Sequence, residues 1–361
     1  MAWLEGWSNR VKITVKAAKV GGATLTDYPV YVNMAALPAA FWTDRVGYTD
    51  VAITTSDEVT PCPRDIGYYD VPTTTGELYF KAPSCSHLAD TDFYLYYGNE
   101  SATEVNDAAT WSSYDIVYLF NESPSETVGC LVNHAANANH MEGASGLAAV
   151  YEASDMFVAG KFGKAWKTRA GGTIGSREWI QKASAINFTE QSLSVTVWGN
   201  IADVTVTGGV FTCTNSFGNG WGLSLGAEAL DVFTGNYTSY AARSIAGLND
   251  TWIHLGGVHI HGGTTTAYVN GAGTTAAGQD ITASTGRCGF GGSDIGVATN
   301  FAQWYNGLFS QARVSTTAKT AAWILGEYNN TSDPATFYEI GAVEDEPPAP
   351  VGAARQAMYV W

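Results

Sequence analysis

Carboxylate pairs that could cut a sugar bond are hard to find in this sequence. Glycoside hydrolysis needs two carboxylates about 5–10 Å apart, one on each side of the scissile bond. Glu228 and Asp231 come nearest to this requirement, but they flank a turn and the start of a strand pattern. A Walker-type glycine loop is also absent from the sequence, and we expect no nucleophile elbow of the α/β-hydrolase kind. We therefore expect surface carboxylates at both positions, no catalytic residue, and a protein that is not an enzyme.

Histidines offer the best candidate metal ligands. His259 and His261 lie two positions apart on one strand pattern, on the same side, and His254 lies upstream on the same run. Two strand histidines can hold a metal, but a third ligand and supporting groups are needed. We expect these histidines to be polar, outward-facing residues. Asp231 and Asp294 are scattered, whereas calcium needs clustered oxygen ligands. The sequence thus assigns no metal site and no cofactor, and it leaves calcium open.

Cysteines give no metal or redox motif. The five are widely spaced, odd in number and without a CxxC pair: Cys62, Cys85, Cys130, Cys213 and Cys288. Cys62 and Cys85 could pair if the chain were exported to an oxidising compartment. Otherwise we expect all five to be free, partly buried thiols, and the pairing of Cys62 with Cys85 stays open.

Aromatic side chains offer a binding chemistry instead of a catalytic one. The chain has 12 Trp and 19 Tyr, whose ring faces can pack on the C–H groups of a sugar. We expect Trp198, Trp252 and Trp323 to be core residues. The candidate glycan contacts are those in or beside predicted loops: Trp221, Tyr237, Tyr240, Trp304 and Tyr305.

Charge excludes several partners. The 18 basic residues form no cluster and the formal net charge is −16, so we expect no nucleic-acid partner. No apolar stretch approaches the roughly 18 residues that span a bilayer, so we expect no membrane insertion. The first ten residues lack the basic and apolar regions of a secretory signal, so we expect the chain to be made in the cytosol.

Strand patterns dominate the chain and divide it into two series. Charged residues make up only 14% of the 361 residues and glycine is abundant, which is typical of sheets joined by many turns. The first series comprises residues 10–16, 28–33, 50–55, 76–82 and 92–97. The second comprises 116–120, 192–198, 209–213, 220–225, 230–233, 252–260, 265–269 and 307–314. We therefore predict an all-β protein, with an antiparallel β-sandwich followed by a jelly roll.

Other local signals complete the prediction. Asn270-Gly271 is typical of a type I′ hairpin turn. Residues 317–328 predict one short helix near the C-terminus, and 345–350 read as a stiff proline-rich linker. The chain then ends in apolar residues that could dock on a partner: Met358, Tyr359, Val360 and Trp361. We place the domain boundaries at 1–110, 111–343 and 344–361, the last being the linker and docking peptide.

The first domain resembles the DUF2341 module. The segments that carry the resemblance are Trp7-Ser-Asn-Arg10, Val11-Lys-Ile-Thr14, Leu25-Thr-Asp-Tyr-Pro-Val30 and Asp92-Phe-Tyr-Leu-Tyr-Tyr-Gly-Asn99. They occur in the order and spacing of that family. The middle departs from it, since Pro61-Cys-Pro63 stands where a simpler hairpin is expected.

The second domain resembles the concanavalin A-like, laminin-G-type jelly roll. The resembling segments are residues 160–166, 193–198, 250–255, 268–271, 307–315, 323–330 and 337–338. Ser310-Gln311 replaces the Asp-Glu of the family's strand, so an acidic role there is in doubt. The resemblance implies a fold and specifies no ligand.

Both modules resemble ones found in phage structural and bacterial surface proteins. We therefore expect a non-catalytic structural protein of a virion exterior, such as a phage decoration, fibre or tail component, and leave open a capacity to bind glycans. Its partners would be other capsid or tail proteins and host-surface glycans, and homo-oligomerisation is left open. The alternative is a secreted or surface carbohydrate-binding adhesin of a bacterium, located outside the cell instead of in a virion.

Overall fold

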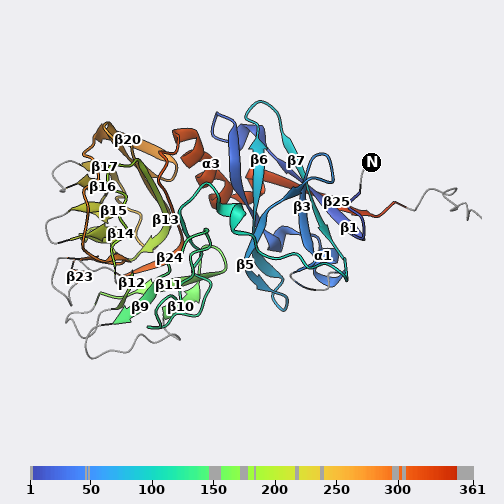
Figure 1. The fold of residues 1–361 in the computed structure, drawn as a ribbon, viewed down its shortest axis with the longest axis horizontal. Coiled ribbons are helices and arrows are strands. Elements are labelled where there is room, and N and C mark those ends of the chain that lie inside the picture. Colours follow the sequence, from blue (N-terminus) through green and yellow to red (C-terminus); the bar gives the residue numbers. More distant parts are fainter. Residues whose placement is uncertain are drawn as a thin grey trace, which may run out of the picture.

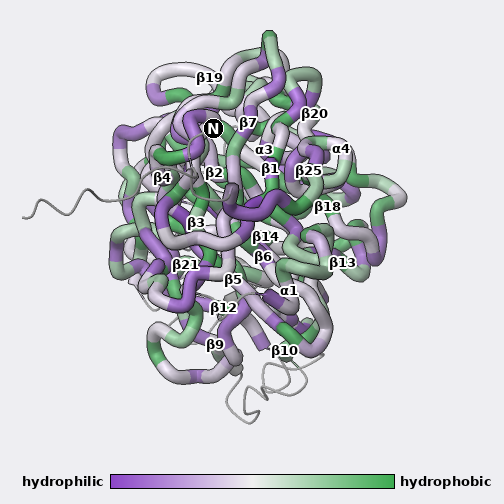
Figure 2. The backbone as a smooth tube through the Cα atoms, turned by 90° about the vertical axis from the view of Figure 1, so that its right-hand side faces the viewer, coloured by the Kyte–Doolittle hydropathy of each residue, from purple (hydrophilic) through white to green (hydrophobic). Residues whose placement is uncertain are grey.

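The computed structural model shows a nearly all-β protein with two lobes side by side (Figure 1), which confirms the predicted fold class. It describes residues 3–44, 47, 49–145, 156–170, 178–182, 184–215, 219–235, 240–294, 301–302 and 306–347. Hydrophilic and hydrophobic segments alternate along the tube in Figure 2. No helix in the described ranges has the length and apolar character needed to cross a membrane.

The first lobe is a sandwich of two antiparallel sheets. One sheet has the strand order β25-β1-β7-β3-β4 and the other β2-β6-β5. Its elements are β1 (Asn9–Val15), β2 (Leu25–Asn33), α1 (Ala39–Asp44), β3 (Val51–Thr55), β4 (Pro61–Cys62), β5 (Arg64–Asp70), β6 (Thr75–Cys85), β7 (Thr91–Tyr97) and β25 (Tyr338–Asp345). The alternation in β1 explains the packing, because Val11, Ile13 and Val15 are fully buried.

The second lobe is a jelly roll of two larger sheets. The eight-stranded sheet has the order β10-β11-β24-β13-β18-β19-β20, with β8 also paired to β24. The seven-stranded sheet has the order β17-β16-β15-β14-β21-β12-β9. Their facing sides enclose a core that includes Trp166, Val197, Phe211, Phe290 and Phe309.

The jelly-roll elements are β8 (Ile116–Tyr118), β9 (Glu142–Ser145), β10 (Phe157–Ala159), β11 (Lys164–Thr168), β12 (Glu178–Lys182), β13 (Leu193–Ile201), β14 (Gly208–Thr214), β15 (Gly220–Leu225), β16 (Ala229–Gly235), β17 (Tyr240–Ser244), β18 (Trp252–His259), β19 (Thr264–Val269), β20 (Ala272–Ala277), β21 (Cys288–Phe290), β22 (Ser293–Asp294), β23 (Phe301–Ala302) and β24 (Gly307–Ser315). The predicted hairpin lies between β19 and β20, where Asn270 has φ 50° and Gly271 has φ 78°.

A disulfide joins two strands of the seven-stranded sheet. Cys213 and Cys288 are direct register partners on β14 and β21, and their sulfur atoms are bonded. Cys62, Cys85 and Cys130 are free. The expectation of five free thiols is therefore wrong for this pair. The bonded cysteines are 75 residues apart, so only the strand topology brings them together.

The end of the chain returns to the first lobe, which corrects the predicted boundaries. After β24, α3 (Ala321–Ser332) and α4 (Pro334–Phe337) lead into β25, which pairs with β1. Ile13 then faces Ile340, and Val11 faces Val343, so β25 extends a sheet built from the first hundred residues. Glu344 and Asp345, expected in a linker, are the last residues of β25.

Helix α3 is the centre of the joint between the lobes. Its Glu327 is buried and accepts hydrogen bonds from Thr196 of β13 (2.5 Å) and from Tyr114 (2.8 Å). The same carboxylate lies 3.2 Å from His254 Nε2 and 3.7 Å from Arg313 Nη1, both buried. Although burial opposes ionisation, these cationic and donor groups lower the pKa of Glu327 to about 2.

Further polar contacts cross the joint directly. His134 Nδ1 lies 2.7 Å from Asp65 of β5, and the two carboxylates of Asp65 and Glu122 raise the His134 pKa to about 10 against the effect of burial. Asn121 donates to the buried Glu77 of β6 over 3.0 Å. Asn330 of α3 makes two hydrogen bonds to the backbone of Tyr31. The two lobes are therefore fixed to each other by buried polar groups that need each other as partners.

Removing Glu327 should reveal how much this joint contributes. We expect Glu327→Leu to lower the free energy of unfolding by about 3–5 kcal/mol, because Arg313 is then left as a buried charge without its counter-ion. The double variant Arg313→Met/Glu327→Leu should recover part of the loss. Urea unfolding followed by tryptophan fluorescence measures both. A single variant that loses less than about 1 kcal/mol would show that the joint does not depend on this pair.

Candidate functional site

The outer face of the eight-stranded sheet is covered over most of its area. Trp198 of β13 donates from its indole N–H to Thr331 of α3 (3.0 Å), and its ring stacks on Tyr328 at 6.2 Å between centroids. Thr196 and His254 on the same face reach Glu327. Helix α3 and the first lobe therefore close this part of the sheet to ligands.

One end of the same face stays open. In the register of the sheet, Lys167 of β11 lies beside Leu308 of β24, which lies beside Asn200 of β13. Their chain neighbours Trp166, Phe309 and Ile201 point into the jelly-roll core. Because side chains alternate along a strand, this row of three must face outward.

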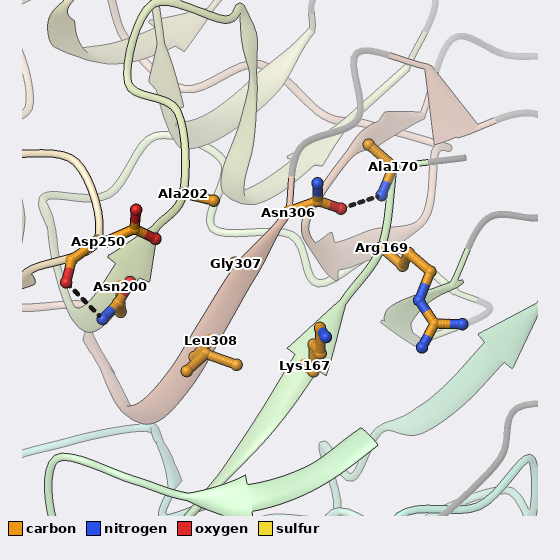
Figure 3. A pocket seen from close by; sticks show the side chains of 9 residues that line it. All are labelled: Lys167, Arg169, Ala170, Asn200, Ala202, Asp250, Asn306, Gly307 and Leu308. Atoms are coloured by element: carbon orange, nitrogen blue, oxygen red, sulfur yellow. Dashed lines mark hydrogen bonds between the residues drawn. The ribbon is translucent and has the colours of Figure 1, made fainter. Parts of the chain in front are cut away.

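A pocket of about 580 Å³ lies over this row, and we call it the rim pocket. It is lined by Lys167, Arg169, Ala170, Asn200, Ala202, Asp250, Asn306, Gly307 and Leu308 (Figure 3). These residues come from the ends of three neighbouring strands, β11, β24 and β13, and from the turns beside them, including the turn that precedes β18. The lining combines amides, cationic groups and a carboxylate with one apolar wall at Leu308.

Hydrogen bonds hold the turns around the rim pocket. Asn306 accepts from the backbone N–H of Ala170 at 2.8 Å, and Asn200 donates to the backbone oxygen of Asp250 at 3.2 Å (Figure 3). The backbone N–H of Ala202 donates to the backbone oxygen of Asn306 at 3.1 Å. The backbone N–H of Asp250 donates to the backbone oxygen of Ile201 at 2.8 Å. The pocket is therefore built in advance and needs little ordering when a ligand arrives.

Charges around the rim pocket are nearly balanced. Arg169, with its side chain 40% exposed, pairs with the buried Glu178 of β12 at 3.0 Å. Among the described lining residues, Lys167 is a second cation and Asp250 is the one carboxylate. Hydrolysis of a sugar bond commonly uses two carboxylates, whereas the described lining contains one.

The structure changes the reading of one predicted glycan contact. Trp221 is only 1% exposed, packs edge-on against Phe211 and donates to the Ile186 oxygen at 3.0 Å. It belongs to the core because the strand predicted for residues 220–225 is an inner strand, β15, and Trp221 packs in the core between the two sheets, so its ring is not available to a sugar. Tyr240 is 47% exposed on the edge strand β17, away from the rim pocket lining.

Other predicted contacts lie outside the described residues. These are Tyr237, Trp304 and Tyr305, together with the docking candidates Met358, Tyr359, Val360 and Trp361. In the sequence, Trp304 and Tyr305 directly precede Asn306 of the rim pocket. Their roles as contacts stay predictions.

Histidines and carboxylates also differ from expectation. His254 and His259 are buried, at 0% and 1% exposure, and only His261 faces outward. Asp231 is 8% exposed instead of lying on the surface, and its burial raises its pKa to about 6. Within the described part of the chain, no three His, Cys, Asp or Glu side chains form a group that could hold a metal ion.

Sequence reasoning missed the rim pocket residues. Asn200, Asp250 and Asn306 lie at the ends of predicted strands, which was the available signal. The sequence patterns do not show that β11, β24, β13 and β18 are neighbours in one sheet. Nor do they show that the strand ends and turns carrying the pocket residues lie at the same edge of that sheet. The site could be found only once the strand order was known.

Comparisons with known proteins identify the second lobe. Residues 175–325 match the family described as the concanavalin A-like lectin/glucanases superfamily, so the jelly roll is a concanavalin A-like domain. No curated protein is similar enough to count as a match.

The solved structures that this chain matches include three domains of botulinum neurotoxins. The type G receptor binding domain has 11% identity and a TM-score of 0.39, covering 60% of this chain and 51% of its own. The binding domain of type DC, solved with rat synaptotagmin II, has 13% identity and a TM-score of 0.43, covering 61% and 52%. The serotype D ligand binding domain, solved with N-acetylneuraminic acid, has 13% identity and a TM-score of 0.39, covering 60% of this chain and 50% of its own. The chain spans about half the length of these structures.

Two aromatic substitutions should separate core from surface. We expect Trp221→Ala to lower the free energy of unfolding by about 3–5 kcal/mol, because it leaves a large cavity. The matched change Tyr240→Ala, on an exposed edge strand, should stay within about 0.5 kcal/mol. Chemical denaturation of both variants measures this. A tolerated Trp221→Ala would mean that the indole is not a core residue.

Proposed function

We propose that this protein is a non-catalytic glycan-binding protein and that the rim pocket is its binding site. The observation that carries the proposal is the position of this pocket. It occupies the uncovered end of a sheet face that α3 and the first lobe otherwise close. Its volume of about 580 Å³ falls within the roughly 300–1,000 Å³ of ordinary small-molecule sites.

The chemistry of the lining suits a saccharide. Hydroxyl groups both donate and accept, and Asn200, Asn306 and Asp250 offer amide and carboxylate groups at fixed places. Leu308 supplies an apolar surface for the C–H face of a sugar ring, and Lys167 supplies a strong donor. With a single carboxylate in the described lining, the pocket can orient a sugar without a partner for general acid–base cleavage.

A glycan array with the full chain, followed by calorimetry on the best ligand, tests this proposal. We expect Lys167→Ala and Leu308→Ala each to weaken binding about tenfold, which corresponds to the loss of one charged hydrogen bond or one apolar contact. Lys12→Ala, a lysine of the first lobe with its side chain 41% exposed, is the matched control and should bind unchanged. No array signal, or binding that ignores both pocket variants, would overturn the assignment.

We propose further that the glycan-binding lobe is displayed on a virion exterior, with a bacterial surface as the alternative location. The support is the resemblance of the first lobe to the DUF2341 module and the apolar C-terminal segment that follows the proline-rich stretch. In this proposal the segment docks on another capsid or tail protein and contributes buried apolar area.

A truncation tests the docking role. The cut should follow Glu346, because β25 runs to Asp345 and the Glu346 N–H donates to Ser8. We expect the full chain to form defined oligomers or to attach to a larger particle, and the truncated chain to do neither. Sizing chromatography and electron microscopy measure both. If the two chains behave alike as monomers, the C-terminal segment is not a docking element.

A further inference from the structure

A second pocket lies in the crevice between the two lobes, away from the rim pocket. Its volume is about 450 Å³, and its walls come from residues 26–27 of β2, the connector 112–115, the segment 315–320 and Trp323 of α3. Most of the side chains on these walls are serine and threonine hydroxyls. We call it the interlobe pocket.

Lys319 is the cationic side chain of the interlobe pocket lining. Its backbone N–H donates to Ser194 Oγ at 2.7 Å, and the same hydroxyl donates to the Thr317 oxygen at 2.8 Å, so this segment is anchored to β13. The ammonium nitrogen lies 4.1 Å from the ring centroid of Trp323 and 5.0 Å from that of Tyr114. The ammonium group of Lys319 therefore packs against two aromatic rings, and the side chain is only partly exposed to water.

The carboxylates around Lys319 have other partners. Asp27, which also lines the interlobe pocket, lies 3.9 Å from Lys81 Nζ. Asp115 accepts from the N–H and the hydroxyl of Thr316, at 2.7 and 3.0 Å. Glu327 is shared by the groups of the interlobe joint, including Arg313, whose guanidinium lies 5.5 Å from the centre of the Tyr114 ring. Among the described residues, no carboxylate lies within ion-pair distance of Lys319.

The protonated form of Lys319 is therefore disfavoured. Burial lowers its pKa to about 8, and the more distant charges of Glu327 and Asp115 offset only part of this effect. An ordinary lysine titrates near 10.4, so a much larger share of Lys319 is the free amine at neutral pH. A desolvated lysine near another cation is the usual form of a lysine that attacks carbonyl groups.

We propose that Lys319 is a covalent attachment site for small, hydroxyl-rich aldehydes, such as the open-chain form of a reducing sugar. The neutral Nζ adds its electron pair to the aldehyde carbon, the C=O π bond breaks toward oxygen, and one N–H proton passes to that oxygen to give a carbinolamine. The carbinolamine hydroxyl then leaves with the second N–H proton as one water molecule, and the C=N bond of the imine forms with no oxidant or reductant required. The hydroxyls of the lining, including Ser112 and Thr317, would bind those of the sugar.

Labelling with glyceraldehyde tests the reactive amine. The full chain is incubated with glyceraldehyde at pH 7, the imine is trapped with cyanoborohydride, and peptide mass spectrometry gives the rate at each lysine. We expect Lys319 to be labelled on the order of ten times faster than Lys12, despite its lower exposure. The Lys319 rate should level off above about pH 8. A rate at Lys319 equal to or below that at Lys12 would overturn the proposal.

A second comparison tests the sugar preference. Propanal carries the same aldehyde without hydroxyl groups, so we expect a lower ratio of Lys319 to Lys12 labelling with it. The double variant Ser112→Ala/Thr317→Val should reduce labelling of Lys319 by glyceraldehyde and leave that by propanal unchanged. Equal selectivity for the two aldehydes would rule out recognition of the hydroxyls. These labelling results do not depend on the rim pocket. A glycan array without a signal would overturn the proposed function of the rim pocket and would leave the labelling of Lys319 unaffected.

Discussion

The arrangement of this protein depends on one buried carboxylate. Glu327 is contacted by β13 through Thr196, by the connector through Tyr114, by β18 through His254 and by β24 through Arg313. Each of these polar groups is buried, and each would be costly to bury without its partner. Helix α3 can therefore lie in only one place on the sheet, and the segment that follows it is directed back to the first lobe as β25.

This constraint decides where ligands can bind. A jelly-roll sheet has one face in the core and one face to solvent, but here α3 and the first lobe cover most of the second face. What remains are the uncovered ends of β11, β24 and β13 with the turns beside them, which form the rim pocket, and the crevice at the edge of the joint, which forms the interlobe pocket. Both pockets are consequences of how the lobes meet.

Local patterns in the sequence were enough to predict most strands but not their neighbours. The alternation of Val11, Ile13 and Val15 identifies β1, and Asn270-Gly271 identifies a hairpin, because both signals are local. The pairing of β25 with β1, and of Cys213 with Cys288, joins residues far apart in the sequence. Trp221 illustrates the same limit: the sequence predicts a strand at residues 220–225, but it does not say that this strand lies inside the sheet with neighbours on both sides and Trp221 in the core.

Cations that rest on aromatic rings occur at several places in this protein, and their partners decide what each can do. Arg10 lies 4.5 Å from the Trp3 ring and 4.3 Å from the Tyr94 ring, and it is also paired with Glu58 and Glu344, so it fastens strands of the first lobe. Arg313 is buried against the rings of Trp111 and Tyr114, and a guanidinium keeps its proton in such a place.

Lys161 rests on Trp198 and donates to the Ser332 oxygen at 3.4 Å. Lys319 differs from all three because its packing against aromatic rings is combined with an open, hydroxyl-lined pocket and carboxylates that have other partners. An amine in this setting can exchange its proton near neutral pH while remaining within reach of a ligand. The same packing that makes the joint rigid therefore leaves one of its cations able to react.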